Sequence, residues 1–411
     1  MLLAYRAAIC LLALFAVAAA QNAEPRKLVE PILRARCLPC HNDLLKDGGI
    51  SFEDRNSLLK GGPHGPAIVP GKPEESIMIH AIRQDGEIKM PPGAKLAVRD
   101  VAILTEWVAG GAPLGTKLPF IGRWDLTIQT PLETYPSWME ITEKDGGPEV
   151  KIVGQVASVH AGSAVELNGS HLSFATLEYF GKQRKVTWDI NLTGGADAGE
   201  LTGTQTRDDG TIGRLTGARA PVLDRKVEAW ANPEPLFNGK DLSGWEPLIT
   251  EPGKAVANNY RAINGELVNL APGANIKTTR KFQDFKLHVE YNCPQEGNSG
   301  VYLRGRYEVQ VEYEAADKND ALHGMGSIYG FLAPEHQVLP RPGKWEVFDI
   351  TLVGSTVTIV RDGTTIIDRR QIPGITGGAL DSHEAEPGPI YIQGDHTGGM
   401  KYRNITISVA R

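Results

Sequence analysis

The sequence predicts a multidomain protein with a small all-α region first, a small antiparallel β-barrel or sandwich next, and a β-sandwich jelly roll at the C-terminus. Its 411 residues exceed one ordinary core and suggest two or three domains. Apolar residues recur at helical spacing only in the first part of the chain. Alternating apolar and polar residues, separated by Gly- and Asp-rich turns, fill the rest and predict strands.

The N-terminus has the features of a targeting segment. The first twenty residues, MLLAYRAAICLLALFAVAAA, carry one Arg, an apolar run and then small residues before Gln21. This pattern predicts a secretory signal peptide over residues 1–20 and a periplasmic or otherwise exported protein. An uncleaved anchor is the alternative, but the apolar run is short for a membrane span. No further transmembrane stretch follows, so we do not expect an integral membrane protein.

Charge narrows the class of partner. The net charge is −6 at pH 7, and no basic stripe stands out along the chain. A nucleic-acid partner is therefore not expected.

Residues 24–115 contain a motif with a specific covalent chemistry. Residues 37–41 are C-L-P-C-H and follow a helical pattern. Two thiols one helical turn apart, Cys37 and Cys40, would form thioethers with the vinyl groups of haem c, and His41 would ligate the iron. A redox dithiol, a disulfide or a zinc site could also use C-x-x-C. The adjacent His favours haem, and no further zinc ligands lie nearby.

Haem iron needs a second axial ligand for fast electron transfer. Met90 in K-M-P-P is well placed, because the two prolines hold the backbone extended. Met78, His64 and His80 are the competing candidates.

Four stretches extend the haem motif into a family resemblance. They are CLPCH, GGPHGPAIVPGKPEESIMIHAI, KMPP and a closing EWVAGGAPLG. Together they resemble the small planctomycete-type cytochrome c domain. The resemblance implies a haem c electron-transfer domain with His41 and Met90 as the iron ligands.

Residues 120–230 predict evenly spaced short strands. The stretches KVTWDINLTG, LTGTQTRDDG and TIGRLTGARA alternate and are separated by turn residues. The opening GRWDLTI is similar to the G-x-W start of lipocalin-like barrels. We predict a spacer or packing domain and no particular ligand for this region. Pro221, Pro233 and Pro235 then mark a linker.

Residues 234–411 predict many strands and no long helix, which favours a jelly roll. The turn R-D-G-T between TVTIV and TIID is a strong hairpin signal. The stretches LFNGKDLSGW, FQDFKLHVEY, GNSGVYLRGRYEVQVEY, PGKWEVFDITLVGSTVTI and GPIYIQGDHTGGMKYRNITI follow in order the 3-keto-disaccharide hydrolase family. The resemblance implies a concanavalin-like jelly roll and glycoside substrates with a ketone at C3. One departure is Gly394, inserted where the family has a compact I-x-L-Q-D-H.

The segment YEVQVEY supplies the candidate chemistry. Glu308, Gln310 and Glu312 alternate and should point to one face of a strand. A C3 ketone acidifies the C2 proton, so one positioned base can remove it while donors stabilise the enolate. The candidate bases are Glu308, Glu312 and His396, and the candidate donors or sugar contacts are Arg304, Gln310, Asn298, Tyr329 and Asp395. A divalent metal ion could polarise the ketone instead.

Three alternatives remain open at this point. Glu308 and Glu312 could be the carboxylate pair of a conventional jelly-roll β-glucanase. The C-terminal region could be a non-catalytic carbohydrate-binding module on an electron carrier. The alternating carboxylates could simply form a solvated sheet face. For the enzyme hypothesis, a sugar 3-dehydrogenase is the expected redox partner, because it must discard two electrons per substrate near the site that consumes its product.

Overall fold

The computed structural model describes residues 28–42, 45–112, 120–144, 147–154, 158–179, 182–193, 199–248, 256–313 and 320–411. The chain divides into two compact units, Met1–Leu118 and Pro119–Arg411, and each is described here by itself. The signal peptide predicted over residues 1–20 lies outside the described residues.

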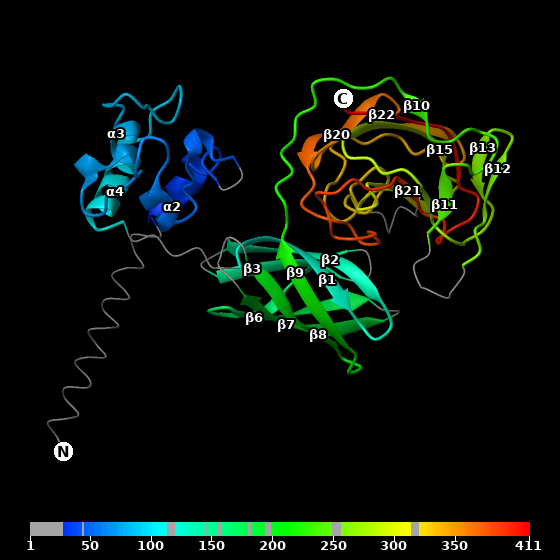
Figure 1. Ribbon diagram of the computed structural model, residues 1–411, viewed down its shortest axis with the longest axis horizontal. Coiled ribbons are helices and arrows are strands. Elements are labelled where there is room, and N and C mark those ends of the chain that lie inside the picture. The colour runs from blue at the N-terminus through cyan, green and yellow to red at the C-terminus, as the bar shows by residue number, and fades with distance from the viewer. Residues whose placement is uncertain are drawn as a thin grey trace, which may run out of the picture. The chain divides into compact units, whose positions relative to one another are not determined.

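The first unit packs short helices around one apolar core (Figure 1). Its elements are a helix over residues 28–36, η1 (Asp47–Gly49), α2 (Arg55–Lys60), η2 (Pro73–Glu75), α3 (Ile77–Arg83) and α4 (Val98–Ala109). The side chain of Asp54 caps α2 by accepting a hydrogen bond from the Ser57 backbone N–H. On α4, Leu104, Trp107 and Val108 recur at helical spacing and face the core.

The second unit begins with a nine-stranded antiparallel sheet in the order β4-β3-β2-β1-β9-β8-β7-β6-β5. Its strands are β1 (Gly122–Gln129), β2 (Thr134–Lys144), β3 (Gly147–Val153), β4 (Val159–Ala161), β5 (Ser163–Asn168), β6 (His171–Tyr179), β7 (Gln183–Thr193), β8 (Glu200–Arg207) and β9 (Ile212–Arg219). The edge strands β4 and β5 are joined by Gly162 alone, whose N–H extends the β3–β4 ladder to the Val150 carbonyl at 2.8 Å. Because this connection holds the two edges side by side, the sheet is a nearly closed barrel, and the predicted small antiparallel β-fold is confirmed.

Inside the barrel, alternate residues of each strand form an apolar core. Trp124, from the GRWDLTI stretch, is fully buried, and its indole N–H donates to the Phe120 carbonyl. The Arg219 guanidinium covers the Trp124 ring at 3.9 Å from its centroid.

The rest of the unit is a β-sandwich, as predicted. One sheet has the order β12-β13-β22-β15-β18-β19-β20, with β10 paired to β22, and the other has the order β11-β14-β21-β16-β17. The strands are β10 (Glu234–Pro235), β11 (Trp245–Pro247), β12 (Tyr260–Ile263), β13 (Glu266–Asn269), β14 (Ile276–Thr278), β15 (Phe285–Asn292), β16 (Asn298–Leu303), β17 (Tyr307–Glu312), β18 (Trp345–Val353), β19 (Thr356–Arg361), β20 (Thr364–Gln371), β21 (Tyr391–Ile392) and β22 (Lys401–Val409). The predicted β19–β20 hairpin is confirmed, with Asp362 and Gly363 both at positive φ.

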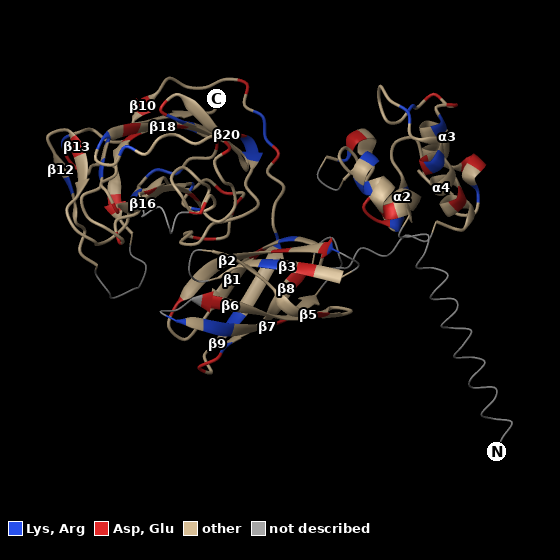
Figure 2. Cartoon of the chain, turned by 180° about the vertical axis from the view of Figure 1, so that it is seen from behind, with Lys and Arg blue, Asp and Glu red and all other residues tan. Residues whose placement is uncertain are grey.

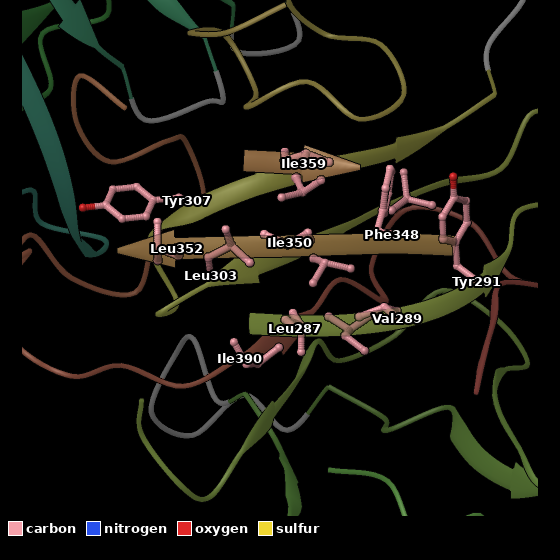
Figure 3. Close-up of a cluster of buried hydrophobic side chains, with 14 of the residues drawn as sticks. Leu287, Val289, Tyr291, Leu303, Tyr307, Phe348, Ile350, Leu352, Ile359 and Ile390 are labelled. Atoms are coloured by element: carbon pink, nitrogen blue, oxygen red, sulfur yellow. The ribbon is translucent and has the colours of Figure 1, made fainter. Parts of the chain in front are cut away.

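Figure 3 shows the sandwich core, in which side chains from both sheets meet. Leu287 and Val289 of β15 alternate with outward-facing neighbours, and so do Ile350 and Leu352 of β18. Leu303 of β16 reaches the same cluster from the opposite sheet. This burial fixes the register of β16 and β17, because a slip by one residue would turn their polar residues into the core.

Barrel and sandwich share contacts within the second unit. Trp138 of β2 packs edge-on against Phe331 of the sandwich, with ring centroids 5.1 Å apart. The Arg123 guanidinium donates to the Pro373 carbonyl at 2.7 Å. Arg225, in the segment predicted as a linker, forms an ion pair with Asp284 at 2.9 Å. That segment therefore makes ordered contacts with the sandwich.

Charged side chains of both signs are interspersed along the chain, as Figure 2 shows. In the part of the chain that the structure describes, none of the helices combines the length and apolar character needed to cross a bilayer.

Candidate functional site

The five-stranded sheet carries a polar face made by its last strands. Pairing of β16 with β17 places Tyr302 opposite Glu308 and Asn298 opposite Glu312, with Gln310 between the two carboxylates. The residues between them, such as Val309, face the sandwich core. We call the group of Asn298, Tyr302, Glu308, Gln310 and Glu312 the polar face. The structure thus brings together Glu308, Gln310 and Glu312, whose common face the alternation predicts.

Glu308 is a buried carboxyl of the polar face with a raised pKa. It is only 3% exposed, and its Oε2 accepts a hydrogen bond from the Tyr302 hydroxyl at 2.8 Å. Burial raises the pKa of Glu308 to about 8, although the Tyr302 hydrogen bond and the charge of His396 act in the opposite direction. A Cβ at position 300 would lie 2.2 Å from Glu308 Oε1, so Gly300 is needed to make room for the carboxyl.

Glu312 is held in a different way. Its Oε1 accepts a hydrogen bond from Asn298 Nδ2 at 2.9 Å, and its Oε2 accepts one from Gln310 Nε2. Gln310 is buried, and its Oε1 has no hydrogen-bond partner among the described residues. The polar face therefore combines the Glu312 carboxylate, which accepts two hydrogen bonds, with the buried Gln310 Oε1, which can accept a hydrogen bond from a hydroxyl group.

Asp395 and His396 adjoin the polar face from the segment after β21. His396 Nδ1 lies 2.7 Å from Asp395 Oδ1. The hydrogen bond to Asp395 raises the pKa of His396, and the charges of Glu308 and Glu312 act in the same direction. The Thr397 hydroxyl accepts a hydrogen bond from the Asn298 N–H at 2.7 Å and so ties this segment to β16.

Gly394 precedes this pair and departs from the family pattern for a local packing reason. A Cβ at this position would lie 2.6 Å from the Tyr260 ring and 2.8 Å from the Ala274 carbonyl oxygen. Its N–H donates to Asn275 Oδ1, and Asn275 Nδ2 in turn reaches Asp395 at 3.4 Å. The inserted glycine is thus accommodated by local packing, and the adjacent Asp395–His396 contact is formed.

Arg304 is not part of the polar face. The chain turns after Leu303, and Arg304 has a positive φ of 51°. Its fully buried guanidinium donates to the Gly354 carbonyl at 2.7 Å and to the Tyr307 hydroxyl at 3.1 Å, and Tyr307 belongs to the sandwich core. The candidate donor Arg304 does not share a face with Glu308, because the strand does not continue through Arg304–Gly305.

Tyr329 lies beside the edge strand β17. Its backbone N–H donates to the Glu308 carbonyl at 3.1 Å, and its ring meets His323 edge-on, with centroids 4.6 Å apart. The segment around Tyr329 therefore supports β17 through the backbone of Glu308.

Three residues that lie beside the predicted site residues were not identified from the sequence: Tyr302, Tyr391 and Gln393. The rings of Tyr302 and Tyr391 stack at 3.9 Å, and Gln393 Nε2 contacts the Tyr302 hydroxyl at 3.3 Å. Tyr302 lies four residues after Asn298 on β16, so strand alternation places both side chains on the same face of the sheet. This alternation could have indicated Tyr302. Tyr391 and Gln393 depend on the pairing of β21 with β16, for which the sequence has no local signal.

The first unit presents a second candidate site, and its residues fit haem c. Cys37 and Cys40 are free thiols, and burial raises the pKa of Cys37 to about 11. The Nδ1–H of His41 donates to the Asp47 carbonyl at 2.7 Å. This hydrogen bond fixes the ring and leaves Nε2 as the available ligand atom, as at other histidine-ligated metals.

The four candidates for the second iron ligand differ in their surroundings. Both ring nitrogens of His80 are engaged, one with Asp85 and one with the Glu74 carbonyl. Met78 is buried in the helical core, and His64 is exposed. Met90 is partly exposed, and its N–H is anchored on the Ala81 carbonyl at 2.9 Å. The backbone at Met90 is thus fixed to α3, and Met90 as the second iron ligand stays a prediction.

The expected divalent metal finds no support. Among the described residues, no group of three or more His, Cys, Asp or Glu side chains is arranged to hold a metal ion.

The fold and these sites define a β-sandwich with a buried polar sheet face, in a chain whose first unit carries a haem-attachment motif. Two family models match the chain, one in each of these parts. Residues 37–93 match the family Planctomycete cytochrome C, and residues 232–408 match the 3-keto-alpha-glucoside-1,2-lyase-like domain. Both family resemblances are thus confirmed in the predicted order.

Solved structures similar to this chain include two candidate glycosyl hydrolases from Parabacteroides distasonis. One is 29% identical, with 43% of this chain and 83% of that chain covered at a TM-score of 0.36. The other is 19% identical, with 44% and 94% covered at a TM-score of 0.35. A Z. galactanivorans protein bound to laminaritriose and laminaritetraose is 12% identical, with 45% and 100% covered at a TM-score of 0.30. The comparison with curated proteins found no match.

Proposed function

We propose that this chain is an exported haem c protein whose β-sandwich cleaves glycosides that carry a ketone at C3. The observation that supports this most is the buried carboxyl of Glu308 beside the Asp395–His396 pair. Both lie within the stretch that matches the 3-keto-alpha-glucoside-1,2-lyase-like domain.

The first step assigned to Glu308 is removal of the C2 proton. The ketone at C3 acidifies this proton, and the electron pair of the C2–H bond moves into an enolate. The partly buried Asn298 amide, which has a second N–H besides the one donated to Glu312, can stabilise the negative charge or hold a sugar hydroxyl.

The second step breaks the glycosidic bond. The enolate collapses, a C1–C2 double bond forms, and the C1–O bond breaks. His396, protonated through its hydrogen bond to Asp395, supplies the proton to the leaving oxygen. Addition of water, with OH to C1 and a proton to C2, then gives the net hydrolysis product.

Burial of Glu308 sets the pH dependence of this scheme. A carboxyl with a pKa of about 8 is a stronger base than an ordinary glutamate, but it must be ionised to accept the proton. The cleavage rate should therefore rise as the pH rises through about 8. Loss of the His396 proton, whose pKa is raised by the hydrogen bond to Asp395, should oppose this rise.

The haem-binding unit would serve the reaction that makes the ketone. Cys37 and Cys40 would hold haem c covalently, with His41 and Met90 as the iron ligands. When bound, haem c supplies reversible one-electron transfer. A sugar 3-dehydrogenase releases two electrons for each ketone that it forms, and we assign residues 37–93 to accept them one at a time. Export, predicted from residues 1–20, would place both activities in the periplasm or outside the cell.

The test is release of the leaving group from a panel of glycosides, each assayed before and after oxidation at C3. Our proposal expects cleavage only after oxidation. Cleavage of the unoxidised glycosides would show a conventional β-glucanase instead. Retention on a glycan column without any turnover would show a carbohydrate-binding module.

A further inference from the structure

A cavity of about 570 Å³ lies away from the polar face, between the outside of the barrel and the loop of residues 382–386. Ligand sites of small molecules usually have volumes of about 300–1,000 Å³. The cavity is therefore large enough for one or two sugar rings. Nothing in the proposed cleavage reaction uses it.

Its floor is the outer surface of three adjacent strands. Strand pairing places Thr127 of β1, Thr216 of β9 and Thr202 of β8 in one row across the sheet. The neighbouring row contains Asp125 and Glu200, on either side of Ala218. All of these residues line the cavity. Three hydroxyls and two carboxyls thus lie on one rigid surface, about 5 Å apart from strand to strand.

The opposite wall contributes another carboxyl, Glu384. It is buried, accepts a hydrogen bond from the Tyr307 hydroxyl at 2.5 Å and is hydrogen-bonded to Asp125. Asp125 thus joins the floor of the cavity to this wall through its contact with Glu384.

We propose that this cavity is a second binding site, for a neutral polyhydroxylated ligand such as a pyranoside or disaccharide. The threonine hydroxyls both donate and accept, and the carboxyls of Asp125 and Glu200 accept from sugar hydroxyls. A site of this kind would hold a glycan chain on the second unit while its end is processed elsewhere.

Three observations favour a neutral ligand over an ion. Burial and the neighbouring Glu384 raise the pKa of Asp125, so the two carboxyls hold a proton between them near neutral pH. The remaining acidic groups, Glu200 and Glu386, disfavour an anion. Among the described residues no group of acidic or histidine side chains is arranged for a metal ion.

The experiment titrates maltose, cellobiose and sucrose into the intact haem-loaded protein and follows binding by saturation-transfer NMR. In Thr216→Val, which removes one hydroxyl and keeps the side-chain shape, we expect about threefold to tenfold weaker binding of the disaccharide that binds wild type. Thr187→Val is the matched control, because Thr187 is exposed on β7 of the same sheet but does not line the cavity. Equal thermal midpoints of the two variants would show that both fold.

Glu308→Gln distinguishes the cavity from the polar face. This variant should bind the disaccharide with the same affinity as wild type. The proposal is overturned if none of the three disaccharides binds, or if Thr216→Val and Thr187→Val have the same affinity. It is also overturned if Glu308→Gln removes the same binding, or if spermidine displaces the disaccharide and binds more tightly. None of these outcomes depends on cleavage of a 3-keto-glycoside.

Discussion

The haem-binding motif and the polar face of the sandwich assemble their chemistry in opposite ways. In the first unit, two thiols and an imidazole come from the five consecutive residues 37–41. On the polar face, the reacting groups come from three segments between residues 298 and 396, which are brought together by the pairing of β16 with β17 and β21. A covalent cofactor can be specified by a short motif, whereas an acid–base site depends on strand register and burial.

The two sites also differ in what activates them. Cys40 is exposed and His41 is partly exposed, and each performs its role with ordinary chemistry once haem is attached. Glu308 gains its basicity from burial, which raises its pKa to about 8. Substitutions in the haem motif should therefore abolish haem attachment completely. Substitutions on the polar face should lower the cleavage rate by degrees.

The largest effect is expected at the haem motif. Replacing both Cys37 and Cys40 by Ser removes the atoms that form the thioethers, so covalent haem should be lost completely. Haem staining after denaturing electrophoresis measures this. Cys293→Ser, a buried cysteine of the second unit, is the control and should keep its haem. Haem that stays attached in the double variant would refute the motif assignment.

Next in size is the loss of turnover on the polar face. Glu308→Gln removes the proposed base and should lower cleavage of a 3-keto-glycoside by about 10²-fold or more, measured as kcat/KM. Glu335→Gln changes a half-exposed carboxylate paired with Arg370 and should change little. Near-wild-type rates for both Glu308→Gln and Glu312→Gln would move the search for the base to His396 or Asp395.

A more selective change is expected at the second haem ligand. Met90→Ala should keep covalent haem but lose the thioether–iron charge-transfer band in the visible spectrum. Met78→Leu, a volume-conserving change in the helical core, should retain the band. If the band survives in Met90→Ala and disappears in Met78→Leu, the ligand assignment is reversed.

The smallest effect concerns stability and pH. The folded pKa of Glu308 is raised above 4.5, so its contribution to stability is complete below pH 4.5 and is lost as the pH rises through about 8. The slope from one such group is at most about 1.4 kcal/mol per pH unit. Glu308→Gln should flatten this part of the dependence of unfolding free energy on pH, measured by urea unfolding between pH 5 and pH 9. An unchanged slope would show that Glu308 titrates normally.

The comparison of the haem motif with the polar face also explains which features the sequence could predict. Local signals predicted the cytochrome c domain around C-L-P-C-H, the hairpin at Asp362–Gly363 and the common face of Glu308 and Glu312 correctly, because each depends on neighbouring residues alone. Arg304 was misplaced, since a turn with positive φ ends β16 there, and Gly305 was the only hint of it.

Other parts of the site could not be predicted because they depend on distant segments. The contact of Gln393 with Tyr302 needs the pairing of β21 with β16. The raised pKa of Glu308 needs burial in the folded sandwich, which strand alternation alone does not specify. The fit of Gly394 against Tyr260 joins residues more than a hundred positions apart.

The central claim is that Glu308 removes the C2 proton of a 3-keto-glycoside, and solvent deuterium tests it most directly. Cleavage in D₂O should place one deuterium at C2 of the sugar product, above the exchange of substrate in buffer alone. In Glu308→Gln, enzyme-dependent deuterium incorporation and cleavage should fall together by about 10²-fold or more. Cleavage without deuterium at C2, or incorporation at the wild-type rate in Glu308→Gln, would contradict the account.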